Sequence, residues 1–269
     1  MNRAFARLLS VFSLVSRIPV TASFERDFSR ADFCLPLIGI PAALLSLGGY
    51  FLAEFLFRDH LLSAIAGLSL QYAAFNLFHL DGLLDSADAM AGHLSAARRL
   101  EILKDSRIGS YAFFFGFVTL AAKVAAIAAL GRLGSIPLVA ALLAAPVGGR
   151  AAGALVPLLS RSARPGGLGA LMKDFSPLRL ACGWLVASLP LVALLAVARA
   201  ISGDSALGWE PWAVAAGSSL FGALFGGASM ARLYTQRVGG FTGDAIGAAV
   251  EIGELACLLG FLAVLAFAS

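Results

Sequence analysis

Two clusters of acidic side chains stand out in a chain that is otherwise strongly apolar. One cluster ends an apolar segment and the other begins one; the six residues are Asp81, Asp85, Asp88, Asp244, Glu251 and Glu254. Residues four and seven positions apart lie within roughly 40° of each other around an α-helix, so the three aspartates of the first cluster share one stripe. Because like charges repel, this stripe predicts a bound cation.

The first cluster has the chemistry of a magnesium and phosphate site. Carboxylates at these spacings suit Mg²⁺, which takes oxygen ligands and keeps water and substrate phosphates in its shell. Downstream, Lys104 and Arg107 would bind phosphate, the lysine as a point charge and the arginine as a fork. Taken alone, the three aspartates could be a solvated helix end. The segment with Lys104 and Arg107, called the basic loop below, could by itself be a salt-bridged turn. Together they predict a site for Mg²⁺ and phosphate.

The second cluster reaches into an apolar segment. Thr242 or Asp244 could cap a helix there, and the free N–H groups at its start would favour an anion. An acid in the middle of a span costs about 2.5 to 3.5 kcal/mol and is normally retained for an ion, a proton or a partner. Glu251 is therefore a candidate ligand, with pairing to Lys123 or Arg150 inside a helix bundle as the alternative.

Three further candidates have ordinary explanations beside the functional ones. His79 could act as a base or ligand beside the first aspartate. Arg164, with Gly166 and Gly167, could form a phosphate-binding loop, or simply a glycine-rich connector. Arg150 could line a substrate cavity, pair with an acid in the membrane, or extend to the surface.

The composition predicts the elements that position these residues. The chain is 59% apolar and 13% charged, with a mean hydropathy of +0.87, whereas soluble proteins average about 25% charged residues. We therefore expect an all-α, polytopic membrane helix bundle that forms a single domain over residues 1–269. No interleaving of basic and aromatic residues suggests nucleic-acid binding.

Windows of roughly 20 apolar residues, long enough to cross the bilayer, predict about seven transmembrane helices in residues 35–268. Prolines in several of them leave six or eight helices open. The predicted spans are Leu35–Phe57, Leu61–Leu80, Tyr111–Gly131, Ile136–Leu159, Leu180–Val197, Trp212–Met230 and Ile246–Ala268.

Residues 1–30 predict an amphipathic helix and a linker rather than a span. Apolar residues recur at helical spacing from Phe5 to Val15, with Arg3 and Arg7 near the start and Arg17 after them. A signal peptide is the rival interpretation, but its apolar core would have only about eight residues. We expect a retained helix lying in the membrane interface.

Basic residues predict the orientation of the bundle. Fifteen of the Lys and Arg residues fall before the first span or in alternate loops after it, and only three fall on the opposite side. The positive-inside rule places the fifteen in the cytoplasm. Both acidic clusters then lie on the cytoplasmic side, although they are more than 150 residues apart.

Six motifs occur in order over nearly the whole chain. They run from Arg17 to Val20, Leu35 to Gly39, His79 to Asp88, Lys104 to Gly109, Arg164 to Gly169, and Gly240 to Glu254. Together they resemble the cobalamin synthase family, the adenosylcobinamide-GDP ribazoletransferases. The chain departs from the common pattern of that family at Leu84, Ser86 and Ala89, none of which is a proposed ligand.

The resemblance implies a multi-pass enzyme of the bacterial inner membrane. It would require Mg²⁺ and join adenosylcobinamide-GDP to α-ribazole or α-ribazole 5′-phosphate, with release of GMP at an active site facing the cytoplasm. Association with a second copy, or with other enzymes of cobalamin assembly, is left open.

The resemblance also assigns roles to residues. The metal ligands would be Asp81, Asp85 and Asp88, completed by Asp244, Glu251 and Glu254, and the other catalytic residues would be Lys104, Arg107 and His79. Substrate contacts would come from Arg17, Asp105, Ser106, Arg150, Arg164, Gly166, Gly167 and Thr242.

Two other functions use similar residues. A CDP-alcohol phosphatidyltransferase also binds a nucleoside diphosphate through clustered aspartates in a membrane, but the Ala-Arg that usually follows its Asp-Gly is missing after Gly82. A cation-coupled transporter would place its acids near the bilayer midplane in discontinuous helices, ideally in two repeated halves. The sequence shows no convincing repeat.

Overall fold

The structure is a computed structural model that describes residues 2–164, 172, 174–202 and 210–268. Within these residues the chain is helical, and the only β-type pairing is an isolated bridge between Ser162 and Phe241. A π-helical turn, η1, interrupts one span. In chain order the elements are α1 (Arg3–Val15), α2 (Ala31–Phe57), α3 (His60–Gln71), η1 (Tyr72–Asn76), α4 (Leu77–Met90), α5 (Ala96–Ile102), α6 (Ser110–Leu133), α7 (Ser135–Leu159), α9 (Pro177–Ala187), α10 (Leu189–Ser202), α11 (Glu210–Val238) and α12 (Gly243–Ala268).

Seven helical stretches in the described residues are long and apolar enough to cross a membrane, which confirms the all-α, polytopic fold. The second stretch, His60–Met90, runs ten residues beyond its predicted end at Leu80. Hydropathy falls where the aspartates begin, but the helix continues, so the stripe has the helical geometry that its spacing predicted.

Prolines do not break most of the spans. Pro36 and Pro41 lie inside α2, and Pro146 and Pro157 lie inside α7, yet both helices are continuous. The fifth span, by contrast, is divided between α9 and α10 immediately before Pro190. Proline removes one backbone donor, and neighbouring helices compensate for that loss in a bundle.

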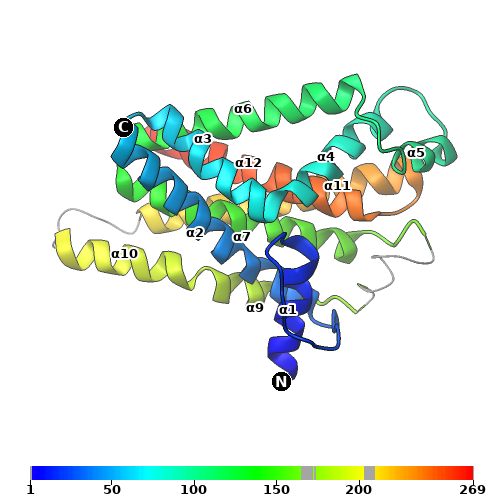
Figure 1. The fold of residues 1–269 in the computed structure, drawn as a ribbon, viewed down its shortest axis with the longest axis horizontal. Coiled ribbons are helices and arrows are strands. Elements are labelled where there is room, and N and C mark those ends of the chain that lie inside the picture. The colour runs from blue at the N-terminus through cyan, green and yellow to red at the C-terminus, as the bar shows by residue number, and fades with distance from the viewer. Residues whose placement is uncertain (1, 165–171, 173, 203–209, 269) are drawn as a thin grey trace.

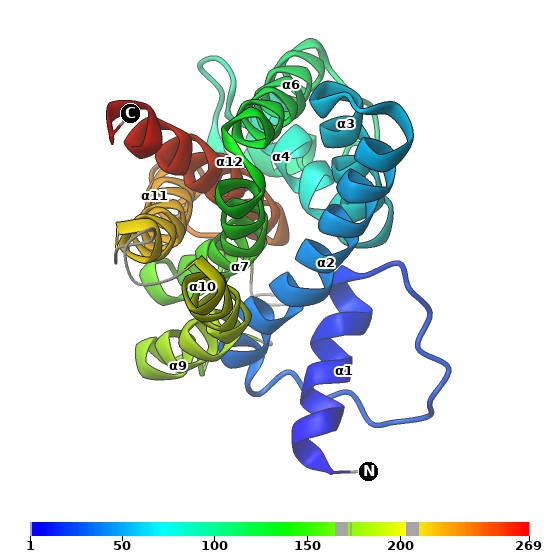
Figure 2. The same ribbon diagram turned by 90° about the vertical axis from the view of Figure 1, so that its left-hand side faces the viewer.

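Helix α7 lies at the centre of the bundle, with α2, α6, α11 and α12 around it (Figure 2). Of its apolar window, 89% is buried, more than in any other span of the described chain. Small residues allow this packing: a Cβ on Gly39 of α2 would lie 2.7 Å from the backbone of Val147, and one on Gly149 would lie 2.7 Å from the Val250 carbonyl of α12. Close backbone approach of this kind stabilises helix contacts in lipid.

Helix α1 projects sideways from the bundle, and the chain then returns to α2 (Figures 1 and 2). Its buried residues are Ser10, Val11 and Val15, whereas Arg3 and Phe5 are exposed. The predicted amphipathic helix is therefore present. Its location in the membrane interface stays a prediction.

Candidate active site

The aspartate stripe and the basic loop line the same cavity. Asp81, Asp85 and Asp88 lie on successive turns of α4, and Lys104 and Arg107 lie in the loop that precedes α6. All five residues line a cavity of about 230 Å³. The structure thus brings together the two motifs that the sequence analysis paired. A cavity of this size has room for an ion and phosphate groups, but not for a large organic substrate.

The three aspartates differ in what they bind. Among the described residues, neither Asp81 nor Asp85 has a hydrogen bond or ion pair to its carboxylate. Asp88, in contrast, accepts hydrogen bonds from the backbone N–H groups of Gly109 at 2.7 Å and Ala112 at 3.0 Å. These are orphan donors at the start of α6, so Asp88 caps a helix that lies next to its own.

Gly109 makes this cap possible. It is the N-cap residue of α6 and has no side chain to satisfy the helix start. A Cβ at this position would lie 2.6 to 2.8 Å from the carboxylate of Asp88, closer than real Cβ atoms approach. The cap therefore joins the end of the basic loop to the aspartate helix, and it uses both carboxylate oxygens of Asp88.

Arg107 and Asp105 of the basic loop pair with each other. The guanidinium donates to the Asp105 carboxylate with Nη2 at 2.5 Å and Nε at 2.9 Å, and the Arg107 side chain is 86% exposed. The hydrogen bonds from Arg107 lower the pKa of Asp105 to about 2, so this carboxylate is ionised at neutral pH. Lys104 and Ser106 are exposed beside them. For Arg107 to bind a phosphate with its fork, it must rotate away from Asp105.

Arg99 was missed by the sequence analysis. It lies in α5, is 1% exposed and donates to the carbonyls of Ala89 at 2.6 Å and Gly92 at 2.8 Å. It also donates to the carbonyls of Ala91 and Leu94. Arg99 thus closes the C-terminal end of α4 and fixes the start of the loop. The sequence shows it only as one basic residue among several.

Asp244 lies beside the aspartate stripe. Gly82 of α4 packs so closely on the start of α12 that a Cβ there would lie 2.8 Å from the Asp244 carbonyl oxygen. The Thr242 hydroxyl donates a hydrogen bond to the Asp244 carboxylate at 2.9 Å. Ser86 of α4 bonds to the hydroxyl of Tyr234 in α11 at 2.7 Å. The two acidic helices therefore meet at the level of Asp244.

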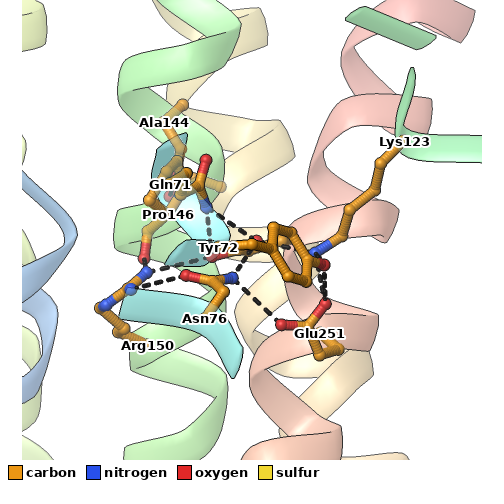
Figure 3. Close-up of polar contacts among 10 residues, drawn as sticks. Gln71, Tyr72, Asn76, Lys123, Ala144, Pro146, Arg150 and Glu251 are labelled. Carbon is orange, nitrogen blue, oxygen red and sulfur yellow. Dashed lines mark hydrogen bonds and ion pairs between the residues drawn. The ribbon is translucent and has the colours of Figure 1, made fainter. Parts of the chain in front are cut away.

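Glu251 and Glu254 lie elsewhere, in a buried cluster deeper in the bundle (Figure 3). Lys123 lies 2.7 Å from a carboxylate oxygen of each, and Arg150 lies 3.0 Å from Glu254. This is the alternative that the sequence left open, pairing with Lys123 or Arg150. Coordination of a cation by either glutamate would require these ion pairs to break, so neither carboxylate is free to act as the ligand that the sequence predicted.

Of the three alternatives that the sequence left for Arg150, the structure shows pairing with an acid inside the bundle rather than contact with the cavity or the surface. It is fully buried and donates to the Pro146 carbonyl, to Glu254 and to the Asn76 side chain. His79 is also buried, at 1% exposure, and neither ring nitrogen has a hydrogen-bond partner within the described chain. The structure thus separates both residues from the acidic stripe, because they face the interior of the bundle.

The remaining predicted contacts lie at the periphery of the site or outside the described residues. Arg164 donates to the Leu100 carbonyl in α5 at 3.0 Å, which holds it beside the basic loop. Arg17 is exposed and lines a different cavity, next to α1. Gly166 and Gly167 lie outside the described residues.

This chain is similar to known proteins over nearly its whole length. The profile of the family described as cobalamin-5-phosphate synthase matches residues 7–262. No solved structure matches the chain. Similar proteins that carry the name adenosylcobinamide-GDP ribazoletransferase include those of three bacteria. The protein of Alkalilimnicola ehrlichii is 37% identical to this chain, and the match covers 99% of this chain and 98% of the relative. The protein of Pseudomonas putida is 36% identical, over 91% of this chain and 94% of the relative. The protein of Pseudomonas aeruginosa is 34% identical, over 96% of this chain and 98% of the relative.

These matches give no support to a CDP-alcohol phosphatidyltransferase or a cation-coupled transporter. The profile covers six of the seven candidate spans in the described residues and most of the seventh, together with the aspartate stripe of α4 and the basic loop before α6. The identity extends over nearly the full length of each relative rather than over one motif. The chain belongs to the cobalamin-5-phosphate synthase family.

Proposed function

We propose that this enzyme joins adenosylcobinamide-GDP to α-ribazole, or to α-ribazole 5′-phosphate, and releases GMP. The family and the names of its relatives supply the substrates. One observation in the structure carries the proposal: free carboxylates on α4 face the cations of the basic loop across one small cavity. A diphosphate between two large substrate halves needs only a small polar site at its centre.

The donor set fits Mg²⁺, although the side chains do not yet converge. Among the described residues, no three acidic, histidine or cysteine side chains are arranged to hold a metal ion. Magnesium in phosphoryl-transfer sites is usually held by one or two carboxylates together with waters and substrate phosphates. Asp81 and Asp85 supply two free carboxylates in the cavity, with Asp244 on the adjoining helix. When bound, Mg²⁺ would neutralise charge on the diphosphate.

The residues of the cavity would then position and stabilise the transfer. A ribose hydroxyl that is free in both forms of ribazole attacks the phosphorus nearer to cobinamide, and the bond from that phosphorus to the GMP oxygen breaks. Lys104 and Arg107 stabilise the negative charge on the departing phosphate. The attacking hydroxyl loses its proton to a carboxylate of the stripe, since His79 is buried away from the cavity.

We place this site at the cytoplasmic face of a bacterial inner membrane. The loop between α4 and α6 and the turn between α11 and α12 lie at the same end of the bundle (Figure 1), and that loop lines the cavity. That end carries the loops rich in Lys and Arg, which favours the cytoplasm.

Purified protein in detergent or nanodiscs tests the function. Adenosylcobinamide-GDP is supplied with α-ribazole, with α-ribazole 5′-phosphate, or with neither, and GMP is measured with and without Mg²⁺. We expect GMP release only when Mg²⁺ and one form of ribazole are both present. Absence of GMP with both forms and Mg²⁺ would contradict the proposal. Release without any ribazole would indicate a hydrolase instead.

A further inference from the structure

The span that carries the aspartates is not a uniform α-helix. The π-helical turn η1, from Tyr72 to Asn76, joins α3 to α4. One extra residue in a turn rotates everything after it by roughly 100° relative to an unbroken helix. The direction in which the side chains of Asp81 and Asp85 point around the helix axis therefore depends on η1. Such turns are rare and occur frequently at functional sites.

Both ends of this turn are bonded to the buried cluster (Figure 3). The Tyr72 hydroxyl donates to Glu251. The Asn76 amide donates to Glu251 at 3.0 Å and to Glu254 at 2.9 Å, and its oxygen accepts from Arg150 at 3.0 Å. Every polar atom of the Asn76 side chain thus has a partner in the cluster.

The cluster is balanced in charge and inaccessible to water. Its two cations, Lys123 and Arg150, are fully buried, and its two anions, Glu251 and Glu254, are at most 2% exposed. Buried ion pairs contribute little net stability compared with apolar packing, yet removal of one partner is costly. Ionisable residues inside a membrane are rare and usually functional. The cluster therefore requires a reason other than added stability.

Helix α12 holds the aspartate span at two levels. At the deep level, Glu251 bonds to Asn76. At the shallow level, Gly82 packs on the backbone of Asp244, and a Cβ on Gly247 would lie 2.9 Å from the His79 carbonyl. The two helices run antiparallel through these contacts. The hydrogen bond between Glu251 and Asn76 fixes the rotation of η1 about the helix axis. The glycine contacts fix the separation of α4 and α12.

We propose that the buried cluster directs the aspartate stripe: it holds η1 in its π-helical form, and thereby aims Asp81 and Asp85 at the basic loop. Tyr72 and Asn76 are the positioning residues through which it acts. The inference rests on the proposed metal role of Asp81 and Asp85. It assigns a use to four charged residues that the transfer reaction itself does not touch.

Tyr72→Phe tests the inference with little change in volume. It removes the hydroxyl that donates to Glu251 and accepts from Lys123 at 3.0 Å. Tyr50→Phe is the matched control, because Tyr50 is as deeply buried and its hydroxyl bonds to His60 at 2.8 Å, at the opposite end of the bundle. Mn²⁺ binding to the purified proteins is measured by electron paramagnetic resonance without substrate, together with thermal stability. The Mg²⁺ concentration for half-maximal GMP release is measured in parallel.

We expect Tyr72→Phe to weaken Mn²⁺ binding and raise the Mg²⁺ requirement by roughly tenfold, the lower end of the loss seen when groups that orient metal ligands are removed. Asn76→Ala should do the same if it folds. Tyr50→Phe should change thermal stability alone. Wild-type Mn²⁺ affinity in Tyr72→Phe, with only its thermal stability lowered, would overturn the inference. So would absence of Mn²⁺ binding to the wild-type protein.

The Mn²⁺ comparison also separates this inference from the proposed function. If the wild-type protein binds Mn²⁺ but releases no GMP, the proposed reaction fails. A weaker Mn²⁺ affinity in Tyr72→Phe would then still support the positioning role, and an unchanged affinity would still refute it.

Discussion

At the scale of single residues, three aspartates with identical chemistry and regular spacing have different surroundings. Asp81 and Asp85 leave their carboxylates free in the cavity, whereas Asp88 uses both oxygens to cap α6. The spacing alone predicted one role for all three. The difference arises because the chain reverses after α5 and brings the start of α6 back onto α4, which helical periodicity does not encode.

Substitution of Asp88 separates capping from metal binding. Asparagine keeps only one of the two acceptor oxygens of Asp88 and is a poorer Mg²⁺ ligand, so Asp88→Asn should lose part of the cap, and about 1 kcal/mol of stability, but retain most GMP release. Asp88→Ala should lower the unfolding free energy by about 0.5 to 2 kcal/mol. Thermal unfolding and turnover of both variants check this. A loss of Mg²⁺-dependent activity in Asp88→Asn as large as in Asp85→Asn would show that Asp88 is a metal ligand after all.

Arg99 gives a second prediction at this scale. Its guanidinium donates to four carbonyls at the end of α4 and in the loop after it. Lysine keeps the positive charge, but its single ammonium group cannot donate hydrogen bonds to all four carbonyls at once. We expect Arg99→Lys to cost about 1 to 3 kcal/mol of stability, because buried acceptors lose their donors. Exposed Arg98, changed to Lys, is the control, and equal unfolding temperatures for the two variants would refute the role of Arg99.

At the scale of elements, hydropathy and periodicity predict the spans and the helical stripe correctly. The π-turn could not be predicted, because nothing in the composition of residues 72–76 differs from the α-helix on either side. The partners of Glu251 were named as an alternative, since Lys123 and Arg150 are basic residues inside spans. Which alternative holds depends on how α6, α7 and α12 pack, and that packing is set by residues far apart in sequence.

The contact between α4 and α12 leads to a prediction about glycine. A Cβ at Gly82 would lie 2.8 Å from the Asp244 carbonyl, whereas a Cβ at Gly48 of α2 would meet nothing within 4 Å. Gly82→Ala should therefore force the helices apart, with a loss of about 1 to 3 kcal/mol and lower turnover. Gly48→Ala should be neutral or stabilising, since alanine favours the helix. Equal thermal stability and turnover of both variants would mean that α4 and α12 are not closely packed.

At the scale of the whole molecule, the C-terminal part of α4 and the start of α12 lie at one end of a bundle of seven candidate spans. The basic asymmetry predicts that this end faces the cytoplasm. Labelling tests it in a chain whose three native cysteines are replaced. Cysteine in place of exposed Ser95, in the loop before α5, should react only in inside-out vesicles, and cysteine in place of exposed Arg132 only in right-side-out vesicles. The reverse pattern would place the site outside the compartment that holds nucleotides.

The central claim is that the cavity between α4 and the basic loop is the site of Mg²⁺-dependent transfer. The most direct test is GMP release from adenosylcobinamide-GDP across a Mg²⁺ titration, by wild-type protein and by Asp81→Asn and Asp85→Asn. Asparagine keeps the shape but removes the charge, so we expect each variant to be correctly folded and to lose most activity, by roughly tenfold or more, with a raised Mg²⁺ requirement. Wild-type turnover and wild-type Mg²⁺ dependence in both variants would contradict the claim.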